Sequence, residues 1–402
     1  MLVPGSAELD LPGEDHYLNV SIVDNSTVGG VDIAPHSGVG QRRSSAGPEA
    51  QVVGGINNLW QIRGSIEAMS ARSSLSQMGA GIKTNSEKAA RLTLATGPTV
   101  TILLCTLNGE RFLAEQLASL ERQTFKNWKV VASDDGSSDR TRSILQAFRG
   151  SFEPGRVRIV EGPRRGAPAN FLFLACAKNL ASEYYAFCDQ DDVWEADKLS
   201  RAIDVLEPAD PGVPALYGSR TSLIDESGRA TGFSPLFPRT PTFRSALVQS
   251  IAGGNTMVFN QAARELLTFC GADVNIPSHD WWLYQVTSAC GGQVHYDTYP
   301  SVRYRQHAQN VIGSNAGFAA RIRRMRMMRQ GRFRQWAELN VVALTRLRPR
   351  MSMENRQIFD LFCKARHRPL LQRAAMFVEA GVYRQTLLGN LGLAAAVVLN
   401  KI

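Results

Sequence analysis

The sequence predicts an α/β fold in which a mostly parallel sheet carries helices on both faces. Residues 100–105 (VTILLC) form a short, apolar and β-branched segment with the composition of a buried strand. The next segment places its apolar residues on one helical face, and the two patterns then alternate up to residue 206. Alternating strands and helices indicate parallel pairing, because each crossover returns the chain to the same end of the sheet.

The predicted elements follow one another along the chain. We predict strands at residues 100–105, 128–132, 157–160 and 184–188, and helices at 111–123, 139–148 and 170–181. Beyond residue 206 the pattern is looser, with strand-like segments at 215–219 and 257–259 and helix-like segments at 261–269 and 280–288. From residue 318 onward the sequence is helical and basic.

Composition divides the chain into three regions. Residues 1–97 are rich in Gly, Ser, Ala and Asn, and their only aromatic residues are Tyr17 and Trp60. Such a segment buries too little apolar surface to offset the entropy of the chain. We therefore expect a disordered or weakly folded leader at 1–97, the α/β domain at 98–315 and a basic helical region at 316–402.

The cysteines and the apolar segments indicate a cytoplasmic protein. The six cysteines form no C-x-x-C pair, which argues against a zinc module or a disulfide framework. The N-terminus lacks a basic segment followed by an apolar one, so we expect no signal peptide. No apolar run reaches the roughly 18 residues that a membrane-spanning helix needs.

The positive charge is concentrated in the C-terminal region. Residues 316–402 hold 17 Lys and Arg and 4 Asp and Glu, so the net charge of +9 leaves −4 for the residues before them. This charge raises the alternative of a nucleic-acid-binding protein, but the region contains no recognisable binding module, and we expect no nucleic acid partner.

A basic amphipathic helix is predicted at the start of this region. Phe318, Ile322, Met325 and Met328 share one helical face and are surrounded by arginines. Such a helix suits anionic lipid, which predicts peripheral contact with the inner face of the cell membrane. The alternative is a helix that packs on the core with a solvated basic face.

Polar segments follow the predicted strands, at the edge where open α/β sheets bind ligands. The first is C-T-L-N-G-E at 105–110. It is not a G-x-G-x-x-G loop, so a dinucleotide-binding fold loses its main support, and an ordinary strand–helix turn remains the alternative. The second is S-D-D-G-S-S-D at 133–139, where a carboxylate can accept the imide N–H of uracil or thymine. A helix N-cap needs one side chain, and this segment holds three acids.

The third polar segment is D-Q-D-D-V-W at 189–194. Its three carboxylates repel one another unless a cation lies among them. Mg²⁺ or Mn²⁺ suits such oxygen ligands and also bridges to diphosphate oxygens. The alternative is a solvated acidic turn that caps the next helix.

The fourth segment, S-H-D-W-W at 278–282, places Asp280 beside two tryptophans at the start of a helix. Partial desolvation raises the pKa of a carboxylic acid and makes it a better general base. The alternative is an acid that stabilises the N-terminus of the helix.

These four segments, in this order, resemble the family-two inverting glycosyltransferases of the GT-A fold. The versions D-Q-D-D-V-W and H-D-W-W, with Y-R-Q-H-A-Q-N at 304–310, resemble the rhamnosyltransferase-like branch that builds bacterial surface polysaccharides. The resemblance covers about residues 99–314 and makes 98–315 a GT-A catalytic domain.

The resemblance implies a role for each matching residue. Thr106, Asn108 and Asp135 would bind the base and ribose of the donor, Asp189 and Asp191 would form a D-x-D pair facing ribose and metal, and Asn255 would lie in a small-residue loop near the donor sugar. Asp280 would be the catalytic base, Trp281 would contact a sugar ring, and His307 would be a further metal or diphosphate contact. For His307 the alternative is a neutral histidine in a β-rich loop. For the loop containing Asn255 it is a bend at the entry to a strand.

The implied reaction transfers a sugar from a dTDP- or UDP-sugar donor to a hydroxyl of a glycan or lipid-linked acceptor. The metal would neutralise the leaving diphosphate as a Lewis acid. One base serves a single displacement, so the configuration of the sugar inverts, whereas retention would need a second, nucleophilic carboxylate. A nucleotidyltransferase on a similar sheet is the alternative enzyme, although those usually carry a glycine-rich phosphate loop with a basic residue after strand one.

Overall fold

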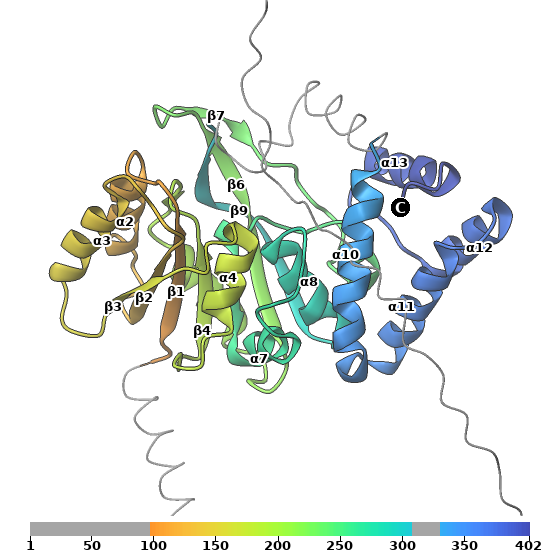
Figure 1. Ribbon diagram of the computed structural model, residues 1–402, viewed down its shortest axis with the longest axis horizontal. Coiled ribbons are helices and arrows are strands. Elements are labelled where there is room, and N and C mark those ends of the chain that lie inside the picture. Colours follow the sequence, from red (N-terminus) through yellow and green to blue (C-terminus); the bar gives the residue numbers. More distant parts are fainter. Residues whose placement is uncertain (1–96, 308–329) are drawn as a thin grey trace, which may run out of the picture. The chain divides into compact units, whose positions relative to one another are not determined.

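The computed structural model describes residues 97–307 and 330–402. Its strands form one nine-stranded sheet in the order β3-β2-β1-β4-β8-β6-β9-β5, with β7 paired to β6 (Figure 1). The predicted leader at 1–97, apart from its last residue, and the predicted amphipathic helix around residues 318–329 lie outside the described residues.

The first half of the sheet is parallel. It contains β1 (Val100–Thr106), β2 (Trp128–Asp134), β3 (Val157–Glu161) and β4 (Tyr184–Cys188). The second half is mixed and contains β5 (Val193–Trp194), β6 (Ala215–Ile224), β7 (Ala230–Phe233), β8 (Val258–Asn260) and β9 (Gln293–Arg305). There β8 runs antiparallel to both β4 and β6, and β9 runs parallel to β6. The predicted mostly parallel sheet with flanking helices is confirmed.

Helices connect and cover these strands. In the α/β region they are α2 (Leu113–Glu121), α3 (Thr141–Gly150), α4 (Ala167–Ala175), α5 (Lys198–Leu206), α6 (Phe243–Ala246), α7 (Gln261–Cys270) and α8 (His279–Ala289), with a 3-10 turn, η1 (Gly254–Thr256). The C-terminal region forms α10 (Arg332–Leu347), α11 (Met353–Ala365), α12 (Leu370–Ala380) and α13 (Leu387–Val398), with the 3-10 turn η2 (Arg348–Arg350) between the first two. The predicted helical character of the tail is confirmed for residues 330–402.

The alternation of side chains along β1 explains why both faces of the sheet need helices. Val100, Ile102 and Leu104 pack in the core that also contains residues of α2, α3 and α5. Leu103 and Cys105 point to the opposite core, beneath α4, α7 and α8. Successive strand residues face opposite sides, and burying one large apolar side chain contributes about 1.5–3 kcal/mol, so both layers of helices stabilise the strand.

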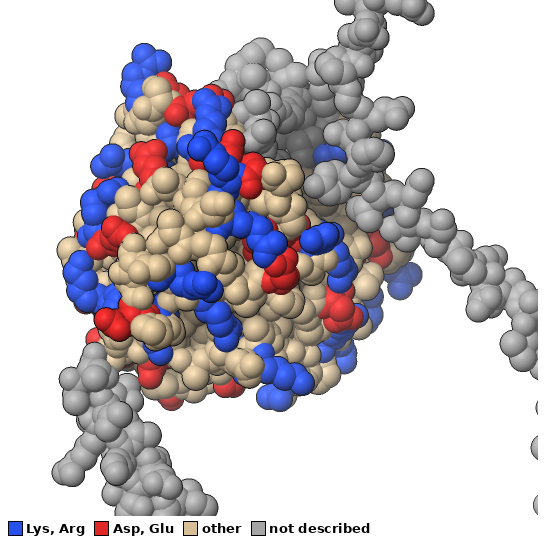
Figure 2. All heavy atoms as spheres, turned by 60° about the vertical axis from the view of Figure 1, so that its left-hand side comes forward, with Lys and Arg blue, Asp and Glu red and all other residues tan. Residues whose placement is uncertain are grey.

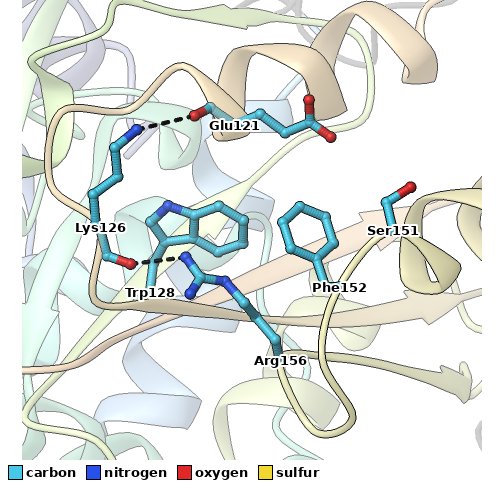
Figure 3. Close-up of a pocket in the computed structure, with 6 residues that line it drawn as sticks. All are labelled: Glu121, Lys126, Trp128, Ser151, Phe152 and Arg156. Carbon is cyan, nitrogen blue, oxygen red and sulfur yellow. Dashed lines mark hydrogen bonds between the residues drawn. The ribbon is translucent and has the colours of Figure 1, made fainter.

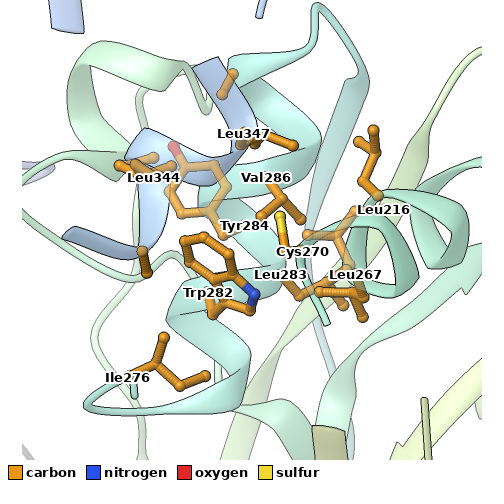
Figure 4. Close-up of a cluster of buried hydrophobic side chains, with 14 of the residues drawn as sticks. Leu216, Leu267, Cys270, Ile276, Trp282, Leu283, Tyr284, Val286, Leu344 and Leu347 are labelled. Carbon is orange, nitrogen blue, oxygen red and sulfur yellow. The ribbon is translucent and has the colours of Figure 1, made fainter. Parts of the chain in front are cut away.

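The C-terminal helices extend the second of these cores. Leu344 and Leu347 of α10 belong to the same buried cluster as Trp282 of α8 (Figure 4). Arg346 pairs with Asp273 at 2.8 Å, and Asn355 donates to the carbonyls of Ser288 and Ala289 at the end of α8. In residues 97–307 and 330–402, no helix combines the length and hydropathy needed to cross a bilayer.

Some predicted boundaries are wrong for local reasons. The helix predicted at 170–181 begins earlier, because Pro168 suits the first turn of α4, and it ends at Ala175, where the chain turns toward β4. The predicted strand at 215–219 continues to Ile224, and β9 was not predicted. Polar residues such as Arg220 and Arg303 interrupt the apolar pattern of both strands, yet the two strands pair along their length.

A cavity of about 540 Å³ lies near the start of β2, away from the polar segments that follow the strands (Figure 3). Trp128 and Phe152 line it, and the Arg156 guanidinium lies 4.2 Å from the centre of the Trp128 ring. Arg156 also donates to the carbonyl of Lys126 at 2.7 Å. These contacts fasten the loop before β3 to the start of β2.

Candidate active site

The polar segments meet at one edge of the sheet because β1, β2 and β4 are adjacent and parallel. Thr106, the last residue of β1, is in register with Asp134 at the end of β2. Leu104 of β1 is in register with Cys188, so Asp189 leaves β4 at the same edge. The register of these strands therefore brings three of the four polar segments to one edge of the sheet.

Thr106 and Asn108 join the first two segments to each other. The buried Thr106 hydroxyl donates to Asp134 Oδ1 at 3.1 Å. Asn108, whose φ is +48°, accepts the Ser138 N–H on its side-chain oxygen at 2.9 Å, and its own N–H donates to Ser137 Oγ at 2.9 Å. Both side chains thus hold the loops that follow β1 and β2 together.

Asp135 is buried and bound by backbone groups. Its Oδ1 accepts the Arg164 N–H at 2.6 Å and its Oδ2 accepts the Gly166 N–H at 2.9 Å. A carboxylate offers about four acceptor positions, so these two bonds orient Asp135 and leave capacity for a further N–H donor.

The segment from Asp189 to Asp192 contains carboxylates in different environments. Asp192 is fully buried and accepts Asn255 Nδ2 at 2.6 Å and the Arg305 N–H at 3.0 Å. Burial raises its pKa well above the ordinary value, with Asp191 and Asp189 adding to the shift. For Asp189, burial and then the charges of Asp191 and Asp280 raise the pKa. Such carboxylates favour a neighbouring cation, because it would remove the cost of charging them.

Asp191 and His307 form the pair best placed to hold that cation. His307 Nε2 lies 2.7 Å from Asp191 Oδ2, and the two side chains are 7% and 18% exposed. The described residues contain no group of three or more His, Cys, Asp or Glu side chains arranged for a metal. Mg²⁺ is commonly bound by one or two carboxylates together with substrate phosphates and water, so a pair of protein ligands fits a metal that arrives with a diphosphate.

Asp280 lies in the first turn of α8. Ser278 caps this helix by accepting the Trp281 N–H, and Asp280 Oδ1 accepts the same N–H at 2.6 Å. Burial raises the pKa of Asp280 to about 6, while hydrogen bonds from backbone N–H groups, including that of Gly254, oppose the shift. The charge of Asp280 adds to the raised pKa of Asp189, after burial and Asp191.

The residues around Asp280 fix its surroundings. Trp281 donates its indole N–H to the Ala246 carbonyl at 2.6 Å, so that edge of the ring is not available to a ligand. Trp282 is fully buried in the core. The His279 ring stacks on Phe171 with centroids 3.8 Å apart, and burial lowers its pKa to about 3. His279 is therefore neutral and contributes packing.

Two further residues organise the site and were not predicted. Gln190 donates to the Leu107 carbonyl at 2.9 Å and accepts the Leu107 N–H at 2.8 Å, which joins the loop after β4 to the loop after β1. A Cβ on Gly109 would overlap the end of the Gln190 side chain, so a larger residue there would displace Gln190 from Leu107. Arg305 is buried beneath Asp191. Gln190 lies in the motif at 189–194 and Arg305 in the motif at 304–310. Their place in these motifs was the only feature of the sequence that pointed to them.

A mixed, mostly parallel sheet whose carboxyl edge carries these acidic segments places the protein in the GT-A class. The profile of "Glycosyl transferase family 2" matches residues 101–267. The dTDP-rhamnosyl transferase RfbG of Shigella flexneri is 30% identical over 241 residues, covering 58% of this chain and 81% of the relative. The chain therefore belongs to glycosyltransferase family 2 and is a glycosyltransferase.

Two further similarities are shorter or weaker. The UDP-Glc:alpha-D-GlcNAc-diphosphoundecaprenol beta-1,3-glucosyltransferase WfgD of Escherichia coli is 32% identical over 108 residues, covering 27% of this chain and 40% of the relative. The crystal structure of S. aureus TarS 1-349 aligns at a TM-score of 0.43 and 14% identity, over 75% of this chain and 88% of that chain. A similarity of that size transfers no ligand to this site.

Proposed function

We propose that this glycosyltransferase moves a sugar, with inversion, from a dTDP- or UDP-sugar to a hydroxyl of a glycan or lipid-linked acceptor. Rhamnose is the first candidate sugar, and bacterial surface polysaccharide is the product class. The proposal depends on one observation above all. His307 contacts Asp191, and the loop of Gly254 and Asn255 contacts both Asp280 and Asp192, although these residues come from distant segments.

The donor end of the site is formed by the loops after β1 and β2. Thr106 and Asn108 shape these loops, and Asp135 is oriented by two backbone N–H groups, which suits acceptance of an imide N–H. Thymine and uracil present the same imide edge, so we keep both nucleotides. The dTDP-rhamnosyl transferase with 81% of its length aligned supports dTDP-rhamnose as the first donor to test.

A divalent cation, Mg²⁺ or Mn²⁺, would be held by Asp191 and His307, with Asp189 facing the ribose. When bound it supplies charge neutralisation for the leaving diphosphate. The protein's part is to hold the side chains of Asp191 and His307 2.7 Å apart, which limits the rearrangement that cation binding requires.

Inversion is supported by the state of the carboxylates. Asp280 has a raised pKa that suits a general base near neutral pH. Asp192, another buried acid of the site, has one oxygen bound by Asn255 and the other by the Arg305 N–H, so it is not a free nucleophile for a double displacement. We also propose that the loop containing Asn255 lies near the donor sugar, and that the face of the Trp281 ring contacts a sugar.

The acceptor is proposed to be lipid-linked and to reach the enzyme at the inner face of the cell membrane. The C-terminal helix α13 carries exposed Leu387, Leu388 and Leu391, with no charged residue between Arg384 and Lys401. Flotation with anionic liposomes tests this contact, and arginine-to-glutamine changes at 321–329 test the basic segment. Equal flotation of wild type and variant would refute a role for those arginines.

The function is tested by supplying a panel of dTDP- and UDP-sugars with Mn²⁺ and measuring nucleoside diphosphate release. We expect release from one donor, with faster release when a glycan or lipid-linked acceptor is added. Salt-sensitive nucleic acid binding without donor turnover would favour the nucleic-acid alternative. On the face shown in Figure 2, basic and acidic side chains are intermixed, and no broad basic surface is visible there.

A further inference from the structure

Arg305 is the last residue of β9, and its guanidinium is almost completely buried beneath the acidic segment. The side chain is 2% exposed. A buried guanidinium is costly unless its donors and charge are matched, so its partners show what the buried charge does.

Those partners come from several segments around the proposed metal pair. Arg305 Nε donates to the Asp191 carbonyl at 3.0 Å, and its backbone N–H donates to Asp192 Oδ1 at 3.0 Å. Nη2 pairs with Glu115 of α2 at 2.5 Å. Nη1 donates to the Glu226 carbonyl at 3.2 Å, in the turn between β6 and β7.

Phe112 completes this arrangement. The Arg305 guanidinium lies 4.7 Å from the centre of the Phe112 ring, and the His307 ring centre lies 5.2 Å from the same ring. His307 is two residues beyond Arg305 on the same strand end. The Arg305 guanidinium therefore holds the backbone of Asp191. It also packs against the Phe112 ring, which His307 contacts.

We propose that Arg305 is a positioning residue that presents Asp191 and His307 as a single divalent cation site and joins this site to the β6–β7 turn. The inference rests on the proposed function, since it assigns Asp191 and His307 as ligands. The planar shape of the guanidinium matters as well as its charge, because its three nitrogens donate to three different partners at once. A lysine keeps the charge but has no such planar group.

The chain supplies a matched control on the same strand. Arg303 pairs with Glu195 at 2.7 Å, and its side chain is 50% exposed. An exposed ion pair of this kind contributes little to stability. Arg303→Lys and Arg305→Lys therefore make the same chemical change in two different environments.

The experiment measures Mn²⁺ binding to the full chain by calorimetry, with saturating dTDP or UDP present and the heat of Mn²⁺ binding to the nucleotide alone subtracted, for wild type, Arg305→Lys and Arg303→Lys. We expect Arg305→Lys to weaken Mn²⁺ affinity about tenfold or more, and Arg303→Lys to leave it within twofold, in keeping with the 10–100-fold losses that follow loss of groups supporting metal ligands. Donor turnover by Arg305→Lys should recover in part at high Mn²⁺, whereas loss of an unrelated structural contact would not respond to metal.

A second variant keeps the test decisive if Arg305→Lys does not fold. Glu115 is 52% exposed, and Glu115→Gln removes only the negative charge that faces Nη2. It should weaken Mn²⁺ binding in the same direction by a smaller factor. If the Arg305→Lys protein folds and binds Mn²⁺ with wild-type affinity, the inference is wrong. If Arg305→Lys does not fold, wild-type Mn²⁺ affinity in Glu115→Gln overturns it. Failure of the wild-type chain to bind Mn²⁺ at all instead overturns the proposed metal site.

Discussion

His307 Nε2 and Asp191 Oδ2 lie 2.7 Å apart, although 116 positions separate the two residues in the sequence. The contact exists because β9 runs beside β5, with Val193 in register with Arg303. The strand pairing thus carries residues 305–307 past the acidic segment 189–192. A histidine packed in this way against a carboxylate is well placed to share a cation with it.

The first prediction concerns this pair. Asp191→Asn should abolish transfer, and His307→Ala should raise the Mn²⁺ concentration needed for half-maximal transfer, because each removes a proposed ligand. Nucleoside diphosphate release across a Mn²⁺ titration measures both effects, and excess EDTA should stop the wild-type reaction. Asp204→Asn, an exposed acid on α5, is the control and should behave as wild type. Undiminished turnover in EDTA would refute the metal requirement.

The second prediction concerns Asp280 as the base. Asp280→Asn should lower the rate of transfer by about 10² to 10⁴, the usual contribution of general base catalysis. Donor and Mn²⁺ affinities should change little, because the base acts on the acceptor hydroxyl. Asp273→Asn is the matched control, since Asp273 is exposed and paired with Arg346. Loss of donor binding by Asp280→Asn would instead place this residue on the donor side of the reaction.

The third prediction is a pH dependence. Asp280 has its pKa raised to about 6, and a base must be deprotonated to act. The kcat/KM for the acceptor should therefore fall as pH decreases through about 6, approaching a tenfold loss per pH unit below it. Steady-state rates from pH 5 to 8 at saturating donor measure this acidic limb of the pH profile. If the residual activity of Asp280→Asn retains the same limb, another group is responsible for it.

The sequence predicted the parts of the site that have a local pattern. The carboxylates of residues 189–192 follow an apolar strand, so their place at the sheet edge could be foreseen, and Asp280 was predicted at the start of a helix that the structure confirms. Arg305 and Gln190 could not be assigned a role, because their partners lie 190 and 83 positions away and leave no trace in local composition. The pairing of β6 with β9 escaped prediction for the same reason, since arginines interrupt both strands.

The fourth prediction concerns Gly254, whose N–H hydrogen-bonds to Asp280 and whose loop carries Asn255. A Cβ at Gly254 would overlap the imidazole of His279, which is held in place by Phe171. Gly254→Ala should therefore displace the loop and reduce transfer at least tenfold. Gly392→Ala is the control, because nothing lies within 4 Å of its added Cβ and alanine favours helix α13 by about 1 kcal/mol. Wild-type transfer by Gly254→Ala would show that the loop tolerates the shift.

The last prediction concerns Lys198, a fully buried lysine at the start of α5. Its Nζ lies 3.6 Å from the centre of the Trp194 ring and has no hydrogen-bond partner among the described residues. Burial lowers its pKa from 10.5 to about 7, so the unfolded chain binds this proton more strongly than the folded one. The resulting destabilisation is complete below about pH 7 and decreases as pH rises toward 10.5.

Lys198→Met keeps the apolar stem without the charge, so it should be more stable than wild type at pH 6, by up to about 1.4 kcal/mol for each pKa unit that burial displaces. The advantage should shrink at pH 9, because the wild-type amine is then neutral in the folded protein. Urea unfolding at both pH values measures the two differences. Lys178→Met, at an exposed lysine, should show neither effect. A Lys198→Met protein that is less stable at pH 6, or whose advantage does not depend on pH, would mean that contact with Trp194 outweighs the cost of the buried charge.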